Sequence, residues 1–198
     1  MSGNYNGNNV VTALASVFIQ PYNASVPAVL PPSTTEYGGD WSNGGALPWQ
    51  TLGATDQGWS LHVTTKTSEI TIEEQSTPVD VLADSKAVSV SGNLSEDLLQ
   101  NLLWAYGGGT LQNIAATGST PGMQVLTLQD ALAKWAIGVE TVNANGFYRR
   151  WLLPKGVIAS DTQTAFRRAA QQHMYPFSFA TICPVSQIQI TDKLTPHT

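Results

Sequence analysis

The feature that most constrains the fold is the stretch of residues 53–109, where short strand patterns run directly into one leucine-rich helix. Apolar and polar residues alternate there, so each segment has one apolar and one polar face, as half-buried strands do. The alternation predicts four short strands, at 59–65, 68–75, 79–82 and 86–91. No nucleophile, metal cluster or phosphate loop interrupts the stretch, which indicates a protein that works through its shape and surfaces.

A single helix, at about 94–106, is predicted to follow these strands. Asn93 or Ser95 can cap its start, and two acidic residues come next, at the positive end of the helix dipole. The triple glycine at 107–109 predicts where the helix stops. An apolar stripe at helical spacing is typical of core packing, and here it consists of Leu94, Leu98, Leu99, Leu102 and Leu103.

Further strands are predicted in the second half, after a loop at 110–124. Pro154 is expected to end one of them, and 164–172 is ambiguous because its local propensity favours helix. The fold class predicted is therefore mainly β, a sandwich or barrel-forming fold with one flanking α-helix. The strand patterns lie at 125–128, 131–142, 147–153, 156–160 and 173–183, with a last short strand within 186–198.

Composition argues against several classes of function. Charged residues make up 12% of the chain and the net charge is −5, so general affinity for nucleic acid backbones is not expected. The single cysteine, Cys183, allows no intrachain disulfide and is predicted to be a buried small hydrophobe. The histidines lack metal-ligand spacing, and the triple glycine lacks the lysine of a phosphate loop. We therefore expect no enzyme activity, no metal and no cofactor.

Residues 1–52 differ in character from the rest and are predicted to form an arm and an assembly loop, with residues 53–198 as the β domain. The apolar segment 10–19 is too short to span a bilayer and is expected to pack on protein. The proline-rich segment 20–52 has no helical or strand period, and long irregular segments are usually functional or disordered. Its aromatic residues favour an arm that folds onto a neighbouring subunit, and we assign this assembly role to Tyr22, Tyr37, Trp41 and Trp49.

Charge is unevenly distributed along the chain. Residues 36–97 hold ten acids and two lysines, which gives −8, whereas residues 98–198 hold seven bases and four acids, which gives +3. Such a division permits head-to-tail complementarity between copies, although acids that merely decorate solvated loops would produce the same count. Adjacent arginines at 149–150 and 167–168 would be split across the two faces of a strand, so a paired phosphate site is not expected.

Several motifs resemble those of the major tail protein of tailed bacteriophages, the subunit of the tail tube. The first is LGATDQGWSLHV leading into TSEITIEE and TPVDVL, across 52–82. The second is KAVSVSGNLSEDLLQNLLWAYGGG, at 86–109. The third, C-terminal motif is FYRRWLLPKGVIASD at 147–161, followed by MYPFSFATIC at 174–183. No single motif is diagnostic, but their order and spacing cover a little over half the chain.

The resemblance implies hexameric rings that stack into a tube whose lumen is a large β-barrel. It implies a structural virion protein, assembled in the host cytoplasm, whose partners are copies of itself, a tape measure protein and a tail terminator. Viral DNA would pass through without specific binding, and no membrane is involved. Residues 59–75 match the hairpin of the barrel wall. Its acidic and polar face would repel the DNA from the lumen, and we assign Glu69, Thr71 and Glu73 to it.

Two other readings are compatible with the same sequence. A tube subunit of a related secretion system, or a tail-terminator protein, would share the fold but not the setting. A β-sandwich carbohydrate-binding module is the alternative from another class, because six tryptophans could supply exposed aromatic platforms for glycans.

Overall fold

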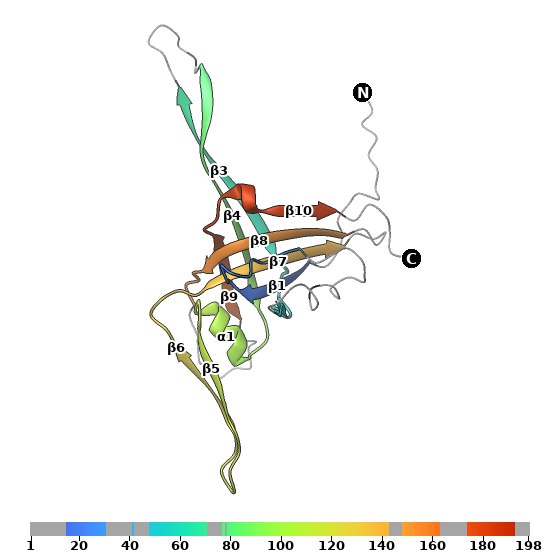
Figure 1. Cartoon of the computed structure of the whole chain (residues 1–198), viewed down its shortest axis with the longest axis vertical. Coiled ribbons are helices and arrows are strands. Elements are labelled where there is room, and N and C mark those ends of the chain that lie inside the picture. Colours follow the sequence, from blue (N-terminus) through green and yellow to red (C-terminus); the bar gives the residue numbers. More distant parts are fainter. Residues whose placement is uncertain are drawn as a thin grey trace.

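The computed structural model describes residues 15–30, 41, 48–70, 77, 79–142, 148–162 and 174–192 (Figure 1). Ten strands, one α-helix and one short 3-10 helix occupy these residues, so the predicted mainly-β fold with one helix is confirmed. The elements are β1 (Ala15–Pro21), β2 (Gln50–Thr51), β3 (Ser60–Ile70), β4 (Asp80–Leu94), α1 (Leu99–Ala105), β5 (Gly109–Ile114), β6 (Met123–Leu128), β7 (Lys134–Val142), β8 (Tyr148–Ile158), β9 (Tyr175–Thr181), η3 (Val185–Gln187) and β10 (Gln189–Asp192).

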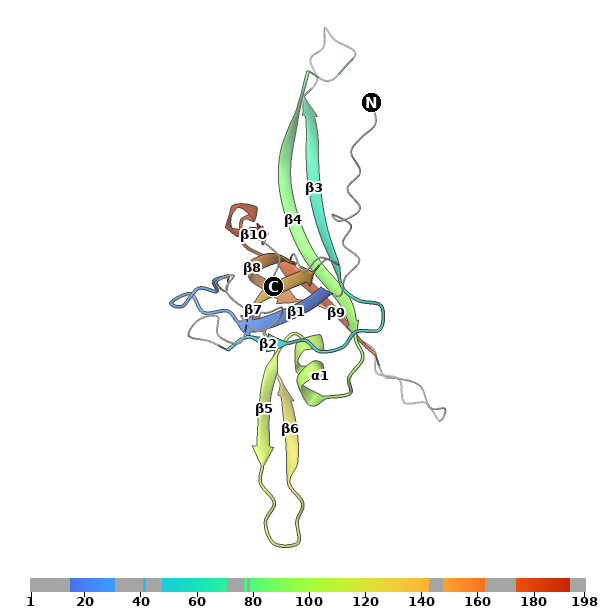
Figure 2. The same cartoon turned by 90° about the vertical axis from the view of Figure 1, so that its right-hand side faces the viewer.

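Eight strands form one antiparallel sheet in the order β2-β1-β7-β8-β9-β4-β3, with β10 also paired to β8. Strands β5 and β6 form a separate two-stranded ribbon. The two views in Figures 1 and 2 show the long β3–β4 pair rising from one end of the body and β5–β6 leaving the opposite end. The molecule is therefore a packed centre with a ribbon at each end of its long axis.

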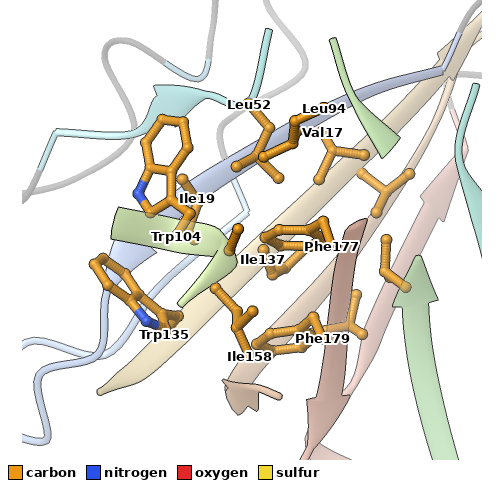
Figure 3. Packing of buried hydrophobic residues seen from close by; sticks show 14 of the residues in the cluster. Val17, Ile19, Leu52, Leu94, Trp104, Trp135, Ile137, Ile158, Phe177 and Phe179 are labelled. Carbon is orange, nitrogen blue, oxygen red and sulfur yellow. The ribbon is translucent and has the colours of Figure 1, made fainter. Parts of the chain in front are cut away.

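Each face of the sheet's centre has its own hydrophobic cluster. Helix α1 covers one face, where Trp104 packs with Val17, Ile137 and Phe177 (Figure 3). The opposite face carries a smaller cluster around Trp41. Strand β7 lies between the two, and its six residues from Trp135 to Glu140 are all buried. This double burial explains why β7 reads as a nearly continuous apolar run.

Two long strands replace the four short ones that alternation predicted between 59 and 91. Strand β3 is continuous through residues 66 and 67, and β4 runs for 15 residues. The register shifts between Lys66 and Thr67, where Asp84 of β4 has no partner on β3. Such a bulge interrupts the alternation of side chains without ending the strand, so the sequence pattern breaks where the backbone does not.

Strand β8 shows the same effect at Pro154. The sequence predicts that Pro154 ends a strand, but β8 continues through it to Ile158 and includes residues 156–158 of the separate strand predicted at 156–160. The pairing with β7 is irregular there, because Trp135 faces Gly156 whereas Ile137 faces Leu153. A proline is tolerated at such a bulge because the ladder does not require its missing N–H.

Helix α1 is shorter than predicted and begins later. Its N-cap is Leu98, with no side-chain cap, whereas Asn93 lies in β4 and the Ser95 hydroxyl donates to the Ala54 carbonyl at 3.0 Å. The expected caps therefore serve the preceding strand and loop. The predicted stop is confirmed, because the helix ends at Ala105 and Gly107 follows with a φ of 80°, the left-handed conformation that favours glycine.

Two strands in the described part of residues 1–52 belong to the sheet. Strand β1 pairs along its whole length with β7, and β2 pairs with β1. The predicted packing of 10–19 on protein is confirmed for residues 15–19, whereas 10–14 lie outside the described residues. The structure joins these strands to the domain predicted to start at residue 53. Cys183, expected to be buried, is half-buried.

Candidate assembly interface

The β3–β4 ribbon, formed by Ser60–Ile70 and Asp80–Leu94, is exposed along most of its length. Beyond Leu61 every residue of β3 is exposed, and so is β4 from Asp80 to Ala87. The outer edge of β3 pairs with no strand of the described chain. Strand β4 pairs with β9 along its base alone, from Ser89 to Leu94. The outer part of the ribbon therefore presents two free edges to solvent.

One face of this ribbon carries most of its large apolar side chains, interrupted by polar residues in the outer part. Residues directly opposite each other in an antiparallel pair share a face, so the register places Leu61 with Val90, Val63 with Val88, and Glu69 with Val81. Val88 and Val90 are buried in the core, whereas Val63 and Val81 are 53% and 54% exposed. Between Val63 and Val81 the same face carries Thr65 opposite Lys86 and Thr67 opposite Ala83. We call the large apolar members of this face the apolar stripe: Leu61, Val63, Val81, Val88 and Val90.

The other face is lined with hydroxyl groups. The register pairs Ser60 with Ser91, His62 with Ser89, and Lys66 with Ser85. Hydroxyl side chains predominate on this face until the tip, where Ile70 and Leu82 are exposed apolar residues. We call the following set the hydroxyl face: Ser60, His62, Thr64, Lys66, Ser68, Ser85, Ala87, Ser89 and Ser91.

Glu69 is the only residue of the predicted luminal set that lies within the described structure. It is exposed near the ribbon tip and shares its face with Val81 and the apolar stripe. Thr71 and Glu73 lie outside the described residues. The luminal assignment of the three residues stays a prediction.

The β5–β6 ribbon offers a second projecting surface, in a segment predicted to be a loop as far as residue 124. Leu111 and Leu126 face each other and pack against the core at its base. Farther out, Ile114 pairs with Met123, and these side chains are 44% and 53% exposed. The sequence of 109–128 contains no charged residue. This ribbon is therefore an uncharged, partly apolar surface.

The structure places the aromatic residues assigned to assembly largely inside the chain. Trp41 is fully buried and Trp49 is 6% exposed, and their rings meet edge to face at 4.8 Å between centroids. Tyr22 is half-buried under Lys155, whose Nζ lies 5.0 Å from the ring centroid. Tyr37 lies outside the described residues. Both tryptophan rings are thus packed in their own chain's core, and an assembly role for the four residues stays a prediction.

A buried ion pair beneath Trp41 was not anticipated from the sequence. Glu140 and Arg150 are paired across β7 and β8, with side chains 0% and 1% exposed. The Arg150 Nε donates to Glu140 Oε2, and the Trp41 Nε1–H donates to the same oxygen at 2.9 Å. The available signal was an acid within the apolar run of β7. As predicted for adjacent arginines in a strand, Arg149 lies on the opposite face and is exposed.

A glycine makes room for Trp41 above this pair. A Cβ on Gly138 would lie 2.1 Å from Cζ3 of the Trp41 ring, so no larger residue fits there without displacing the ring. Phe18 stacks on the same ring at 5.0 Å between centroids. Trp41 therefore closes this face of the sheet and excludes water from the ion pair.

The remaining chemistry of the described residues is sparse. They contain no group of three or more potential metal ligands. An open depression of about 420 Å³ lies at the base of the β3–β4 ribbon, lined by residues that include Trp59, Asn93 and Pro176. Burial and a hydrogen bond from its hydroxyl to Asp97, at 2.5 Å, raise the pKa of Tyr175 to about 12. These features describe a folded scaffold with exposed surfaces.

Comparison with known proteins adds no family. Neither the known protein families nor the curated proteins contain a match to this chain. Within the described residues, no helix is long and apolar enough to cross a membrane.

Proposed function

We propose that this chain is the subunit of a self-assembling tube, the tail tube of a tailed bacteriophage. Hexameric rings of it would stack into the conduit through which DNA is ejected into the host. The observation that carries the proposal is the β3–β4 ribbon, which projects from a well-packed body with two free edges and an apolar stripe. Function would then reside in the contacts between copies, with no enzyme activity or cofactor.

An exposed ribbon of this kind is unfavourable for an isolated subunit. Unpaired strand edges invite pairing with another chain, and a projecting two-stranded ribbon is marginally stable in water. Val63 and Val81 are both more than half exposed on it, although burying such side chains typically contributes about 1.5–3 kcal/mol each. Assembly would pair the free strand edges and bury the exposed valines in an interface.

Two ribbons that leave opposite ends of the body support stacking. A contact between the top of one copy and the bottom of another uses different surfaces, so it repeats without closing. Figure 2 shows the β3–β4 and β5–β6 ribbons pointing in opposite directions along the long axis. Open-ended repetition of this kind is what a tube requires.

The setting follows from the same proposal. The virion would be the final location, with a tape measure protein inside the tube and a terminator at its end. DNA would pass without specific binding, in keeping with the net charge of −5.

Electron microscopy and sedimentation of the purified chain over a range of concentrations test this function. We expect open-ended tubes that lengthen as the concentration rises. Isolated closed rings would favour a terminator or a secretion-system subunit, and a monomer at every concentration would contradict self-assembly.

A ribbon truncation provides the matched control. Replacing 65–86 with a two-residue turn keeps the rungs from Ser60 to Val63 and their partners, including the buried Val88 and Val90. We expect this variant to melt cooperatively near the wild-type temperature and to remain unassembled. Normal tubes from the truncated chain would show that the ribbon is not the assembly element.

The carbohydrate-binding alternative gains no support from the tryptophans. None of the six is exposed. Trp59, beside the depression at the ribbon base, lies against Gly92, where a Cβ would be 2.7 Å from the ring, and meets Phe177 edge to face at 5.5 Å. The ring is therefore engaged in packing and does not form a free platform.

A further inference from the structure

We propose that the two faces of the β3–β4 ribbon have different roles in the assembly. The apolar stripe is the contact surface for a second copy of this chain, and the hydroxyl face lines a water-filled channel. This inference rests on the proposed function and adds to it the orientation of the ribbon. It assigns Glu69 to the contact face, in contrast to the luminal role that the family resemblance implies.

The apolar stripe is a continuation of the core that the chain itself does not cover. At its base Val90 and Val88 are 0% and 5% exposed, whereas Val63 and Val81 farther out are more than half exposed. All four lie on one face, where Thr65, Lys86 and Thr67 separate Val63 from Val81. A stripe that begins as core and continues into solvent leaves apolar surface that favours contact with another protein surface.

The bulge at Asp84 preserves this stripe. In an uninterrupted strand, Val81 and Val88 would point to opposite faces, because an odd number of positions separates them. The unpaired Asp84 shifts the alternation by one residue and returns Val81 to the face of Val88 and Val90. The Ser68 hydroxyl donates a hydrogen bond to the Asp84 carboxylate across the ribbon. One irregularity therefore keeps the exposed valines aligned with the core.

The free edges indicate that the partner is another copy. Strands β3 and β4 run in opposite directions, and the outer edge of each is unpaired in the outer part of the described ribbon. Copies related by rotation about an axis along the ribbons place β3 of one beside β4 of the next. That arrangement is antiparallel, the same pairing that joins the two strands within each copy. Repetition produces a closed wall of strands, with one inner and one outer face.

The position of the packed centre of each copy determines which face of the ribbon points into the channel. Helix α1 contributes Leu103 and Trp104 to the same core cluster as Val88 and Val90, so the body lies on the side of the apolar stripe. In a closed wall the bulky bodies occupy the outside, where there is space for them. The hydroxyl face then points to the interior, where its side chains hydrogen-bond with water. Its sparse positive charge offers a polyanion little to bind.

Adjacent residues on opposite faces provide a matched test. Val63→Asp and Thr64→Asp introduce the same charge one residue apart on exposed β3, the first into the apolar stripe and the second into the hydroxyl face. We expect Val63→Asp to reduce the assembled fraction about tenfold or more, as a buried unpaired carboxylate would. We expect Thr64→Asp to remain within about twofold of the parent chain. Circular dichroism melts report whether each variant is folded.

Thiol labelling tests the same assignment without adding charge. In a Cys183→Ser background, Val63→Cys and Thr64→Cys are labelled with a small charged thiol reagent before and after assembly. We expect assembly to slow labelling at position 63 about tenfold or more, and at position 64 by less than about twofold, because only the first site is buried by protein.

The outcomes separate this inference from the proposed function. Tubes that tolerate Val63→Asp but not Thr64→Asp, or protection at 64 alone, would reverse the faces and overturn the inference while assembly stands. Tubes insensitive to both changes, with both thiols reactive, would show that the ribbon is not the contact surface. A parent chain that never assembles would overturn the proposed function and this inference with it.

Discussion

At the residue scale, Glu140 and Arg150 place two opposite charges inside the sheet, where neither side chain is more than 1% exposed. Removing ions from water is costly, and mutual attraction offsets that cost only when each group keeps its hydrogen bonds. Trp41 contributes through its Nε1–H, which donates to Glu140 Oε2. Trp41 is therefore held against strands β7 and β8 by this hydrogen bond as well as by the packing of its ring.

Removing one partner of this pair should be more damaging than removing the charge from both. Arg150→Met leaves the Glu140 carboxylate buried and unpaired, and we expect it to lower the free energy of unfolding by about 3–5 kcal/mol. Adding Glu140→Gln removes the stranded charge and keeps an acceptor for Trp41. The double variant should therefore be more stable than Arg150→Met, as denaturant unfolding can measure. Additive losses would contradict the coupling.

The raised pKa of Tyr175 predicts that the protein loses stability at high pH. Its folded pKa is raised from 10.0 to about 12 by burial and by its hydrogen bond to Asp97. A raised pKa means that this contribution is fully present below pH 10 and is lost as the pH rises towards 12. Tyr175→Phe should therefore flatten the decline of the melting temperature between pH 10 and 12.

The comparison variant for Tyr175 is Tyr22→Phe, which removes a phenol packed on Lys155 instead. It removes one phenol while leaving the hydrogen bond from Tyr175 to Asp97 in place, so it controls for the loss of a hydroxyl group. Equal slopes for the parent chain and Tyr175→Phe would show that Tyr175 does not control the alkaline transition.

At the scale of the elements, the bulge in β4 is the feature that gives the ribbon two distinct faces. The alternation rule alone would place Val81 among the hydroxyl groups. The extra residue, Asp84, moves it to the apolar stripe. A local irregularity that is invisible to a periodicity count thus decides the character of a whole surface.

Inserting one alanine between Lys66 and Thr67 should test this directly. Asp84 would then pair with the inserted residue, β4 would alternate without the register shift, and Val81 would turn to the hydroxyl face. We expect the chain to fold, because the buried rungs at Val88 and Val90 are unchanged, but to assemble less than Asp84→Asn, which keeps the residue count. Sedimentation velocity compares the two, and equal assembly would show that the aligned valines are not required.

At the scale of the whole molecule, two different ribbons project from opposite ends, so the two ends present different surfaces. Such a subunit can repeat head to tail, and its contacts need not close on a pair. The central body, with a hydrophobic cluster on each face of the sheet, supplies the rigid part. The tube proposed above depends on this division between a self-contained core and incomplete ribbons.

Part of the fold can be predicted because it depends on the local periodicity of the sequence. Alternation located the strand-forming segments between 59 and 94, and the leucine stripe and triple glycine located one helix and its end. The helix start was misplaced because Ser95 bonds to a residue about forty positions away, and no local rule contains that partner. The continuity of β3 and β8 was missed because a bulge and a strand break look alike in one dimension.

The sequence by itself determined which side chains share a face within an uninterrupted stretch of strand, because the period of two is a property of the local backbone. At the Asp84 bulge, only the strand pairing decided it. Only the tertiary structure decided what covers each face. It placed Trp41 over the Glu140–Arg150 pair and left the outer apolar stripe uncovered. Coverage depends on residues far apart in the chain, such as Trp41 and Glu140, which are separated by 99 positions. The surfaces proposed for assembly are therefore formed only when these distant segments are brought together.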